Sequence, residues 1–300
     1  MPDTLSPRPV LAADLERLLP LYELLLGRTV TLDALQARAQ RLPDGTHWLI
    51  EEAGDVLAIC DWESDVYSPP DFVRLGLLVR PEFRGQGHGS ALLNLARRNG
   101  AAGITANVPD DESASLAWAE KRGFTRHAHR FESALNPQEF EPEQHAAPLP
   151  EGVTLGDMTQ ASDADWDGFN ALLIESFAQT PDAQGLPRWS IETAREGVQL
   201  NSRIRPDWLI CARRGGKLLG FTAALTYGTF AYNQMTAVAT SARGLGLAYL
   251  LKVELLRRLK ASGITSVRTH NHAANAPMLR VNEKLGYQKQ HGRWEMRARL

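Results

Sequence analysis

Two glycine-rich segments carry the strongest chemical signal in this 300-residue chain. Each follows an apolar segment that ends in valine five residues before an arginine. The segments read Val79 to Arg84-Gly85-Gln86-Gly87-His88-Gly89-Ser90, and Val238 to Arg243-Gly244-Leu245-Gly246-Leu247-Ala248. Glycines let a backbone approach an anion closely, and the N-terminus of a following helix offers unpaired N–H groups to it. Both segments are therefore predicted to bind phosphate groups.

Two other kinds of anion-binding loop do not match these segments. A P-loop needs G-x-x-x-x-G-K-[ST], and neither segment contains the lysine. A dinucleotide-binding loop needs G-x-G-x-x-G and a later acidic residue that binds the ribose. The first segment gives G-x-G-x-G, and no clear ribose-binding carboxylate follows it.

The two segments belong to a longer internal repeat. Trp48-Leu49-Ile50 recurs as Trp208-Leu209-Ile210, and WAEKRGF (118–124) recurs as VNEKLGY (281–287). The offsets are 208 − 48 = 160, 243 − 84 = 159 and 286 − 123 = 163. Three landmarks in one order at a nearly constant offset indicate a duplicated domain.

The elements that position these landmarks follow from the apolar periodicity. Helical spacing covers 11–26 and 163–177 before the hairpins, and 90–98 and 247–260 after the glycine segments. Short strands follow at 104–108 and 264–269. Residues 136–152 are rich in Pro and Glu and predict a spacer. We expect an α/β (α+β) fold with domains at 1–140 and 153–300 and a linker at 141–152.

The combined pattern resembles the GCN5-related N-acetyltransferase (GNAT) superfamily. The resemblance rests on [RQ]-x-x-G-x-[GA] after a valine-ended strand, on E-K-x-G-[FY], and on the stretch from Thr269 to Tyr287 with Asn271, Asn275 and Asn282. It implies two tandem GNAT-like domains, each a mixed central sheet flanked by helices. A layout of two unequal copies is similar to that of the mycothiol synthase family, a precedent for architecture and not for substrate.

The resemblance also implies a cofactor, acetyl-CoA, and residues that hold it. The glycine segments, from Arg84 to Ser90 and from Arg243 to Ala248, would bind the pyrophosphate. Asn275 would contact the pantetheine or phosphate region, and the backbone near Val79 or Val238 would bind pantetheine and the reacting oxygen. The first half has Glu112 in place of Asn275, and a carboxylate beside a phosphorylated cofactor is unfavourable, so the second half is the expected catalytic unit.

The catalytic acid and base are not fixed by the sequence. Many relatives have a tyrosine four residues before the glycine of E-K-x-G-[FY], whereas this chain has Ala119 and Asn282 there. Residues 72–79 and 230–238 contain no Asp or Glu. The candidates in the second half are His270, His272, Glu175 and Tyr232. The two histidines could share one strand face, but no third ligand is in range, so no metal site is predicted.

We therefore expect an acetyl-CoA-dependent N-acetyltransferase that acts by direct attack of a primary amine of a small molecule or peptide. The alternative is a non-catalytic coenzyme A-binding or sensing protein. Segments near residues 22–45 and 175–205 would select the acceptor. The net charge of −2 favours no nucleic-acid partner, and no apolar run approaches the roughly 18 residues of a membrane span. Two distant cysteines fit a reducing, cytoplasmic setting.

Overall fold

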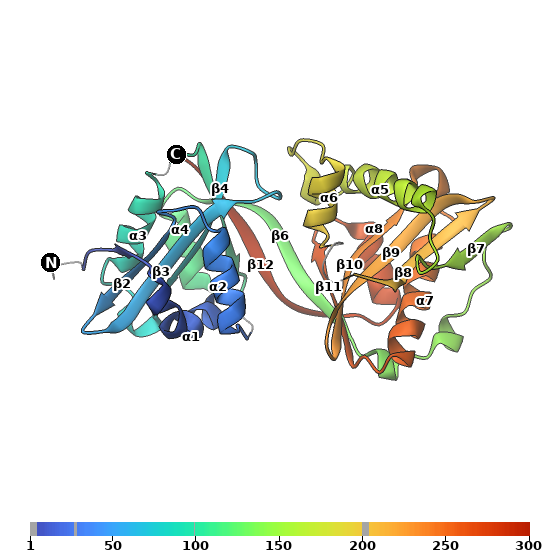
Figure 1. Cartoon of the computed structure of the whole chain (residues 1–300), viewed down its shortest axis with the longest axis horizontal. Coiled ribbons are helices and arrows are strands. Elements are labelled where there is room, and N and C mark those ends of the chain that lie inside the picture. Colours follow the sequence, from blue (N-terminus) through green and yellow to red (C-terminus); the bar gives the residue numbers. More distant parts are fainter. Residues whose placement is uncertain (1–4, 27–28, 99, 200–203) are drawn as a thin grey trace. The chain divides into compact units, whose positions relative to one another are not determined.

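The chain folds into two compact units, shown in the computed structural model of Figure 1. The structure describes residues 5–26, 29–98, 100–199 and 204–300. Unit 1 comprises Met1–His127 and Trp294–Leu300, and unit 2 comprises Ala128–Arg293. The Pro- and Glu-rich spacer at 136–152, which was expected to separate the domains, lies within unit 2. The division falls instead inside two long strands, β6 (Thr125–Leu135) and β12 (Gln288–Arg299), which each run from one unit into the other.

Unit 1 is a mixed sheet in the order β1-β2-β3-β4-β5-β12. From β1 to β5 the neighbouring strands are antiparallel, except that β4 and β5 run parallel. Its remaining elements are β1 (Arg8–Pro9), α1 (Leu15–Leu26), α2 (Leu32–Arg41), β2 (His47–Glu52), β3 (Asp55–Ser64), β4 (Phe72–Val79), α3 (His88–Ala96), β5 (Gly103–Pro109) and α4 (Ser113–Glu120).

Helices cover both faces of the unit 1 sheet (Figure 1). Alternate residues of a strand point to opposite faces, so neighbours such as Leu49 and Ile50 enter different cores. Leu49 packs in the cluster of α1 and α2, and Ile50 packs in the cluster of α3 and α4. The sheet therefore has one face toward α1 and α2 and the other toward α3, which begins directly after the first glycine segment.

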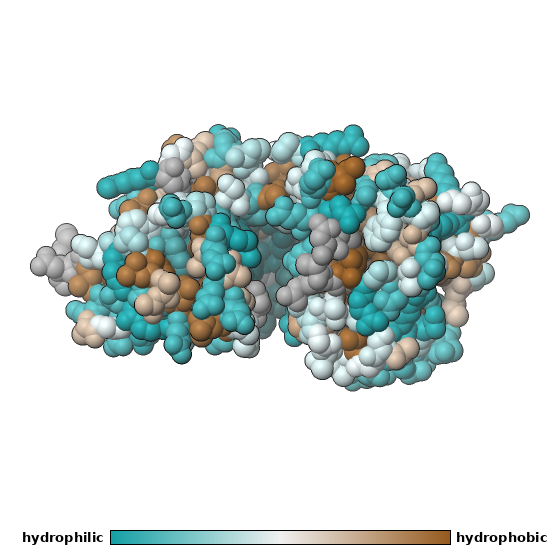
Figure 2. Space-filling view, viewed as in Figure 1, coloured by the Kyte–Doolittle hydropathy of each residue, from teal (hydrophilic) through white to brown (hydrophobic). Residues whose placement is uncertain are grey.

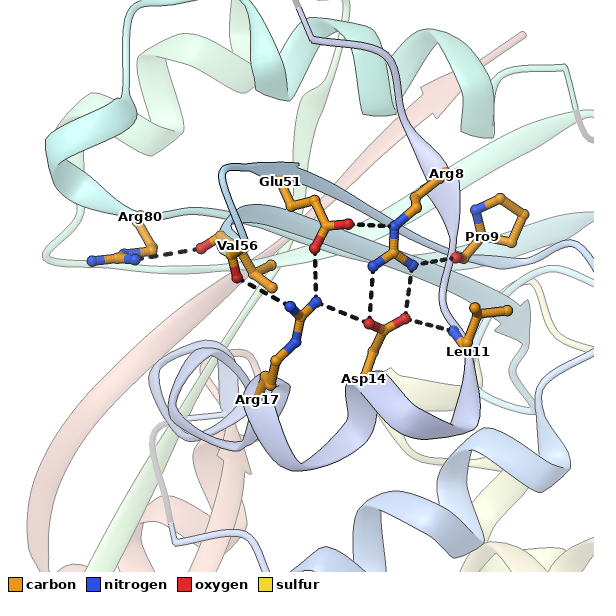
Figure 3. Close-up of polar contacts among 9 residues, drawn as sticks. Arg8, Pro9, Leu11, Asp14, Arg17, Glu51, Val56 and Arg80 are labelled. Atoms are coloured by element: carbon orange, nitrogen blue, oxygen red, sulfur yellow. Dashed lines mark hydrogen bonds and ion pairs between the residues drawn. The ribbon is translucent and has the colours of Figure 1, made fainter.

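Four charged side chains fasten the start of the chain to unit 1 (Figure 3). Arg8 on β1 pairs with Asp14 and Glu51, each at 2.7 Å. Arg17 on α1 binds the same two carboxylates, at 2.9 and 2.7 Å. The hydrogen bonds from Arg8 and from the backbone of Leu11 lower the pKa of the Asp14 carboxyl to about 2. This alternating cluster joins β1, α1 and β2.

Unit 2 repeats the plan with the sheet order β7-β8-β9-β10-β11-β6. The parallel pair is β10 and β11. Its elements are β7 (Val153–Gly156), α5 (Asp163–Ala178), α6 (Ile191–Gly197), β8 (Ile204–Arg214), β9 (Lys217–Tyr227), β10 (Phe230–Val238), α7 (Leu247–Ala261), β11 (Ser266–His272) and α8 (Ala276–Lys284). The predicted fold class is confirmed.

The helices expected at 11–26, 90–98, 163–177 and 247–260 are present within a few residues of those bounds. The helices α2 and α6 were not predicted. Only Leu35 in α2 and Ala194 in α6 are fully buried. In α2 the partly buried Leu32 and Ala39 continue the apolar stripe of Leu35, so its helical spacing was available in the sequence. Both begin with a hydroxyl cap: Thr31 Oγ1 accepts the N–H of Ala34, and Ser190 Oγ accepts the N–H of Thr193.

The unit 2 sheet also lies between two helical layers. On one face Trp208 and Ile210 pack with Leu251 and Leu255 of α7. On the other, Phe221 packs against Phe169 of α5, with 4.6 Å between the ring centroids. The helix α5, with α6 packed against it, therefore covers the face of the sheet opposite to α7. Any site on β10 lies between these two helical layers.

The visible surface in Figure 2 is mainly hydrophilic, with hydrophobic side chains scattered over it. Among the described residues, no helix is both long and apolar enough to cross a bilayer.

Candidate active site

The second glycine segment forms a nest of backbone N–H groups at the start of α7. Gly244 and Gly246 have φ of 83° and 74°, in the left-handed region that other residues rarely adopt. Among the described residues, the N–H groups of 244–248 donate to no backbone acceptor, whereas the next two, of Tyr249 and Leu250, bond to Gly246. Unpaired N–H groups at the positive end of a helix favour an anion, so this segment has the donors that a phosphate group needs.

The first glycine segment builds the same nest at the start of α3. Gly85 and Gly87 have φ of 81° and 92°. Two predicted cofactor residues contribute less than expected, however. The His88 side chain is buried, 4% exposed, so only its backbone can face an anion. The N–H of Ser90 already donates to Gly87, and its hydroxyl accepts from Arg122.

The two loop arginines have different partners. Arg84 forms an ion pair with Glu112 at 3.4 Å, and its Nε donates to the carbonyl of Val79. Arg243 instead donates to the Gln179 side chain at the end of α5. One guanidinium thus lies beside a carboxylate and the other beside a neutral amide, which gives unit 2 the more positive nest.

The strand β10 contains a β-bulge. Asn233 pairs with Ala224 of β9 and Met235 pairs with Ala223, so Gln234 is an extra residue. The parallel pairing with β11 covers only Phe230 to Tyr232 and then stops. The bulge therefore lies where the two parallel strands cease to bond.

The residues of β10 beyond the bulge present free backbone groups. The N–H of Ala239 donates to Leu219 of β9. Because an antiparallel ladder alternates, the N–H and C=O of Val238 and Thr236 point the other way, toward β11. No β11 residue pairs with them among the described residues. They can bind an extended polar chain that lies along β10.

A tyrosine and a histidine meet on the α5 side of this strand pair. The hydroxyl of Tyr232 on β10 lies 2.5 Å from Nδ1 of His270 on β11. His270 keeps an exposed edge, yet desolvation by the surrounding protein lowers its pKa. The cations Arg293 and Arg130 lower the pKa further, whereas Glu132 and Asp182 raise it. A lowered pKa favours the neutral imidazole, and a neutral Nδ1 can accept a hydrogen bond from the tyrosine hydroxyl.

The two other catalytic candidates lie apart from this pair. His272 Nδ1 accepts the backbone N–H of Ala274 and helps to turn the chain after β11. Glu175 lies on α5, where its carboxylate accepts from Gln179 at 3.5 Å. It lines a cavity of about 310 Å³ in the segment expected to select the acceptor, together with Phe177, Gln179, Leu186, Arg188 and Trp189. Residues 27–28 and 200–203 of the two expected acceptor segments lie outside the described residues.

The asparagines of the second half have structural partners. The Asn275 side chain caps α8 by accepting the N–H of Met278 at 3.5 Å. Asn282, at the position where many relatives have tyrosine, is buried and donates to Asn271 at 2.7 Å. Its counterpart Ala119 is also buried.

Neither cysteine is placed for nucleophilic chemistry. Cys60 and Cys211 are both fully buried, and burial raises the pKa of both thiols, that of Cys211 to about 12. Within the described ranges, no group of three or more His, Cys, Asp or Glu residues is arranged to hold a metal ion.

From the sequence, Leu250-Leu251-Lys252 fits the helix of the GNAT resemblance, but no role was expected for Lys252, Asn233 or Gln234. Lys252 is fully buried in α7, and its Nζ donates to Oδ1 of Asn233 at 2.5 Å. The available signal was a length difference, because the segment ending at Val238 has nine residues and the one ending at Val79 has eight. A lysine after Leu250-Leu251 on an apolar helix stripe was a second signal.

Comparison with known proteins agrees with this geometry. The model of the GNAT acetyltransferase domain matches residues 43–126, and that of the GNAT acetyltransferase family matches residues 169–287. The mycothiol acetyltransferase of Acidothermus cellulolyticus is 31% identical over 245 residues, 74% of this chain and 70% of the relative. That of Thermobispora bispora is 29% identical, covering 82% and 81%.

Solved structures share the fold over the whole chain. A GCN5-related N-acetyltransferase from Sphaerobacter thermophilus has a TM-score of 0.79 at 18% identity and covers 100% of this chain and 96% of its own. A tandem GNAT protein from the clavulanic acid biosynthesis pathway has a TM-score of 0.71 at 22% identity and covers 99% and 98%. With two matching domains and a relative above 30% identity, the chain belongs to the GNAT acetyltransferase family and carries two of its domains in tandem.

Proposed function

We propose that unit 2 transfers the acetyl group of acetyl-CoA to a primary amine of a small molecule or peptide. The observation that carries this proposal is the combination, on one strand, of a bulge, free backbone groups and a phosphate nest. In unit 2 all three follow one another along β10 and into α7. Family membership supports the reaction class.

The residues of unit 2 fit the shape and charge of the donor. The nest of 244–248 and the Arg243 guanidinium suit the pyrophosphate, since backbone N–H groups and a fixed cation both favour negative charge. The backbone of Thr236 and Val238 suits the amides of pantetheine. When bound, acetyl-CoA supplies a thioester carbonyl that an amine nitrogen can attack, forming a C–N bond as the C–S bond breaks.

The pair of Tyr232 and His270 gives the amine proton a destination. The Tyr232 oxygen takes a proton from the attacking nitrogen while its own proton passes to Nδ1 of His270, across a distance of 2.5 Å. This route needs His270 to be neutral at the start, and desolvation favours that state by lowering its pKa. Glu175 and His272 have no place in this path.

The acceptor would approach from the side of α5 and α6. The cavity of about 310 Å³ lies on that side, and it is lined by the stacked rings of Phe177 and Trp189 with Glu175 and Arg188. An amine with an apolar body fits such a lining. Because relatives are named mycothiol acetyltransferase, the mycothiol precursor that lacks the acetyl group is the first polar acceptor to compare.

The test is release of free thiol from acetyl-CoA across a panel of primary amines. The panel contains polar amino sugars, the mycothiol precursor, aralkyl amines and peptides with a free N-terminus. We expect amine-dependent turnover, with Y232F reducing kcat far more than KM for acetyl-CoA. Calorimetry with coenzyme A is run on the same preparations. Binding without turnover for any amine would contradict the proposal and support the alternative of a coenzyme A sensor.

A further inference from the structure

A lysine lies in the core of unit 2 without a charged partner. Lys252 is 1% exposed, and no carboxylate pairs with it in the part of the chain that the structure describes. Its Nζ donates to Oδ1 of Asn233 at 2.5 Å and lies 5.0 Å from the centre of the Tyr287 ring. A buried ammonium with one neutral acceptor is costly to the fold, so its presence calls for a reason.

Unit 1 shows that the fold does not need this lysine. The loop arginines differ by 243 − 84 = 159, so Lys252 corresponds to 252 − 159 = 93, which is Leu93. Before the bulge the strands align at 230 − 72 = 158, so Asn233 corresponds to Leu75. Leu75 and Leu93 are both buried in one apolar cluster. The same two positions are therefore an apolar pair in one unit and a polar pair in the other.

The asparagine that Lys252 binds is the residue next to the bulge. Asn233 Nδ2 donates to Thr222 Oγ1 and to the carbonyl of Ala223, each at 3.0 Å. Its own carbonyl accepts from Thr269 Oγ1 on β11 at 3.0 Å. The side chain and backbone of Asn233 thus connect β9, β10, β11 and α7 at the point where the extra residue Gln234 leaves the ladder.

The corresponding strand of unit 1 has no bulge. The pairing of β4 with β3 runs from Val73 to Val79 without a register shift. The polar pair and the bulge are therefore present together in unit 2 and absent together in unit 1. Because Lys252 donates to the side-chain oxygen of Asn233, it holds the bulge at one position along the strand.

We propose that Lys252 is a positioning residue for acetyl transfer, which fixes the bulge of β10 through Asn233. In this arrangement the lysine contacts neither donor nor amine. It sets the direction of the backbone groups of Gln234 and Thr236 where the thioester would lie. The inference rests on the proposed function of unit 2.

The experiment transplants the unit 1 pair into unit 2. The full-length double variant N233L/K252L is compared with the native protein and with L255M, a conservative change at another buried position of α7. Three quantities are measured: kcat for thiol release with the best amine, Kd for coenzyme A by calorimetry, and the thermal midpoint. We expect kcat to fall at least about 30-fold, while the thermal midpoint is equal to or above that of the native protein and Kd changes less than about threefold.

A merely structural pair would behave differently. In that case the apolar pair would restore packing and turnover together, and a double variant with native kcat overturns the inference. If N233L/K252L does not fold, K252M is judged by the same kcat and Kd criteria, because it leaves the bonds of Asn233 to Thr222 and Ala223 in place. Failure of the proposed function has its own signature, since the native protein itself would then show no amine-dependent turnover.

Discussion

The strands β4 and β10 begin at a phenylalanine and end at a valine that leads to a glycine nest, yet they differ by one residue. In β4 the ladder with β3 is unbroken. In β10 the extra Gln234 interrupts the ladder with β9, and a buried lysine binds the residue before it. Both strands leave their parallel neighbour before they reach the nest, β4 after Leu75 and β10 after Tyr232. The bulge, and not the separation of the parallel strands, is therefore what distinguishes β10 from β4.

The two units also differ in the side chains on the sheet face that α1 and α2 cover in unit 1 and that α5 and α6 cover in unit 2. At the positions of Tyr232 and His270, unit 1 has 232 − 158 = 74, Arg74, and 270 − 163 = 107, Asn107. Arg74 forms an ion pair with Glu63 at 2.5 Å, and Glu63 forms a second ion pair with Arg38 at 3.2 Å. Charged side chains that bond to one another occupy this face of unit 1, whereas in unit 2 the same positions hold the hydrogen-bonded Tyr232 and His270.

Reversing the charge of the loop arginine should give the largest difference in activity between a change in unit 2 and the matched change in unit 1. In R243E the donor would lose a charge-assisted hydrogen bond, about 1.5–3 kcal/mol, and would meet a like charge. We expect kcat/KM for acetyl-CoA to fall about 1000-fold. The matched variant R84E should stay within about threefold of the native value. If thiol release falls equally in R243E and R84E, unit 1 also takes part in turnover.

Removing the proton path should have the next largest effect. General-base catalysis contributes about 10²- to 10⁴-fold, so Y232F and H270Q should each lower kcat about 100-fold at saturating amine. The double variant should be little slower than either single one, because both act in one path. H145Q, remote in unit 2 and bonded to Tyr249, is the matched histidine control. Multiplicative losses in the double variant would place the two residues in separate roles.

The sequence predicted the repeat, the nests and the helices that follow them because these depend on local features, namely glycine spacing and apolar periodicity. It also named Tyr232 and His270, but not that they meet, since they are 38 residues apart and the parallel strand pair brings them together. The exchange of β6 and β12 between units could not be predicted. Both strands are long, and their composition does not change at the point where one unit ends. The Pro-rich spacer at 136–152 is the one clear composition change, and it lies inside unit 2.

The pH dependence of stability should reveal Lys252. Burial lowers its pKa from 10.5 to about 7, whereas the unfolded lysine stays protonated up to its ordinary value. Between these two values the unfolded state binds one more proton, so the contribution of this residue to stability rises with pH above 7 and is constant below it. From pH 7 to 8 we expect about 1 kcal/mol, or roughly 2–4 °C in the thermal midpoint of unit 2.

The variant K252M isolates that contribution. It has no buried ammonium, so its midpoint should exceed that of the native protein most at pH 7 and below, and the difference should shrink as the pH rises. Differential scanning calorimetry at several pH values measures it. A constant difference at all pH values would mean that Lys252 titrates as an ordinary lysine.

The smallest expected effect concerns the carboxylate beside the nest of unit 1. Glu112 and Arg84 are both about half exposed and lie 3.4 Å apart, and such surface pairs contribute roughly 0.2–1 kcal/mol. Glu112 also places a negative charge where Asn275 stands in unit 2. In E112N the arginine is freed and the like charge facing a phosphate is removed.

We expect coenzyme A to bind unit 1 about three- to fivefold more tightly, as measured by calorimetry in the R243E background, where unit 2 is silent. Because salt screens such pairs, the gain should shrink at high ionic strength. A gain that is insensitive to salt would point to the shape of the α4 N-terminus, and no gain at all would locate the weakness of unit 1 in its regular strand β4.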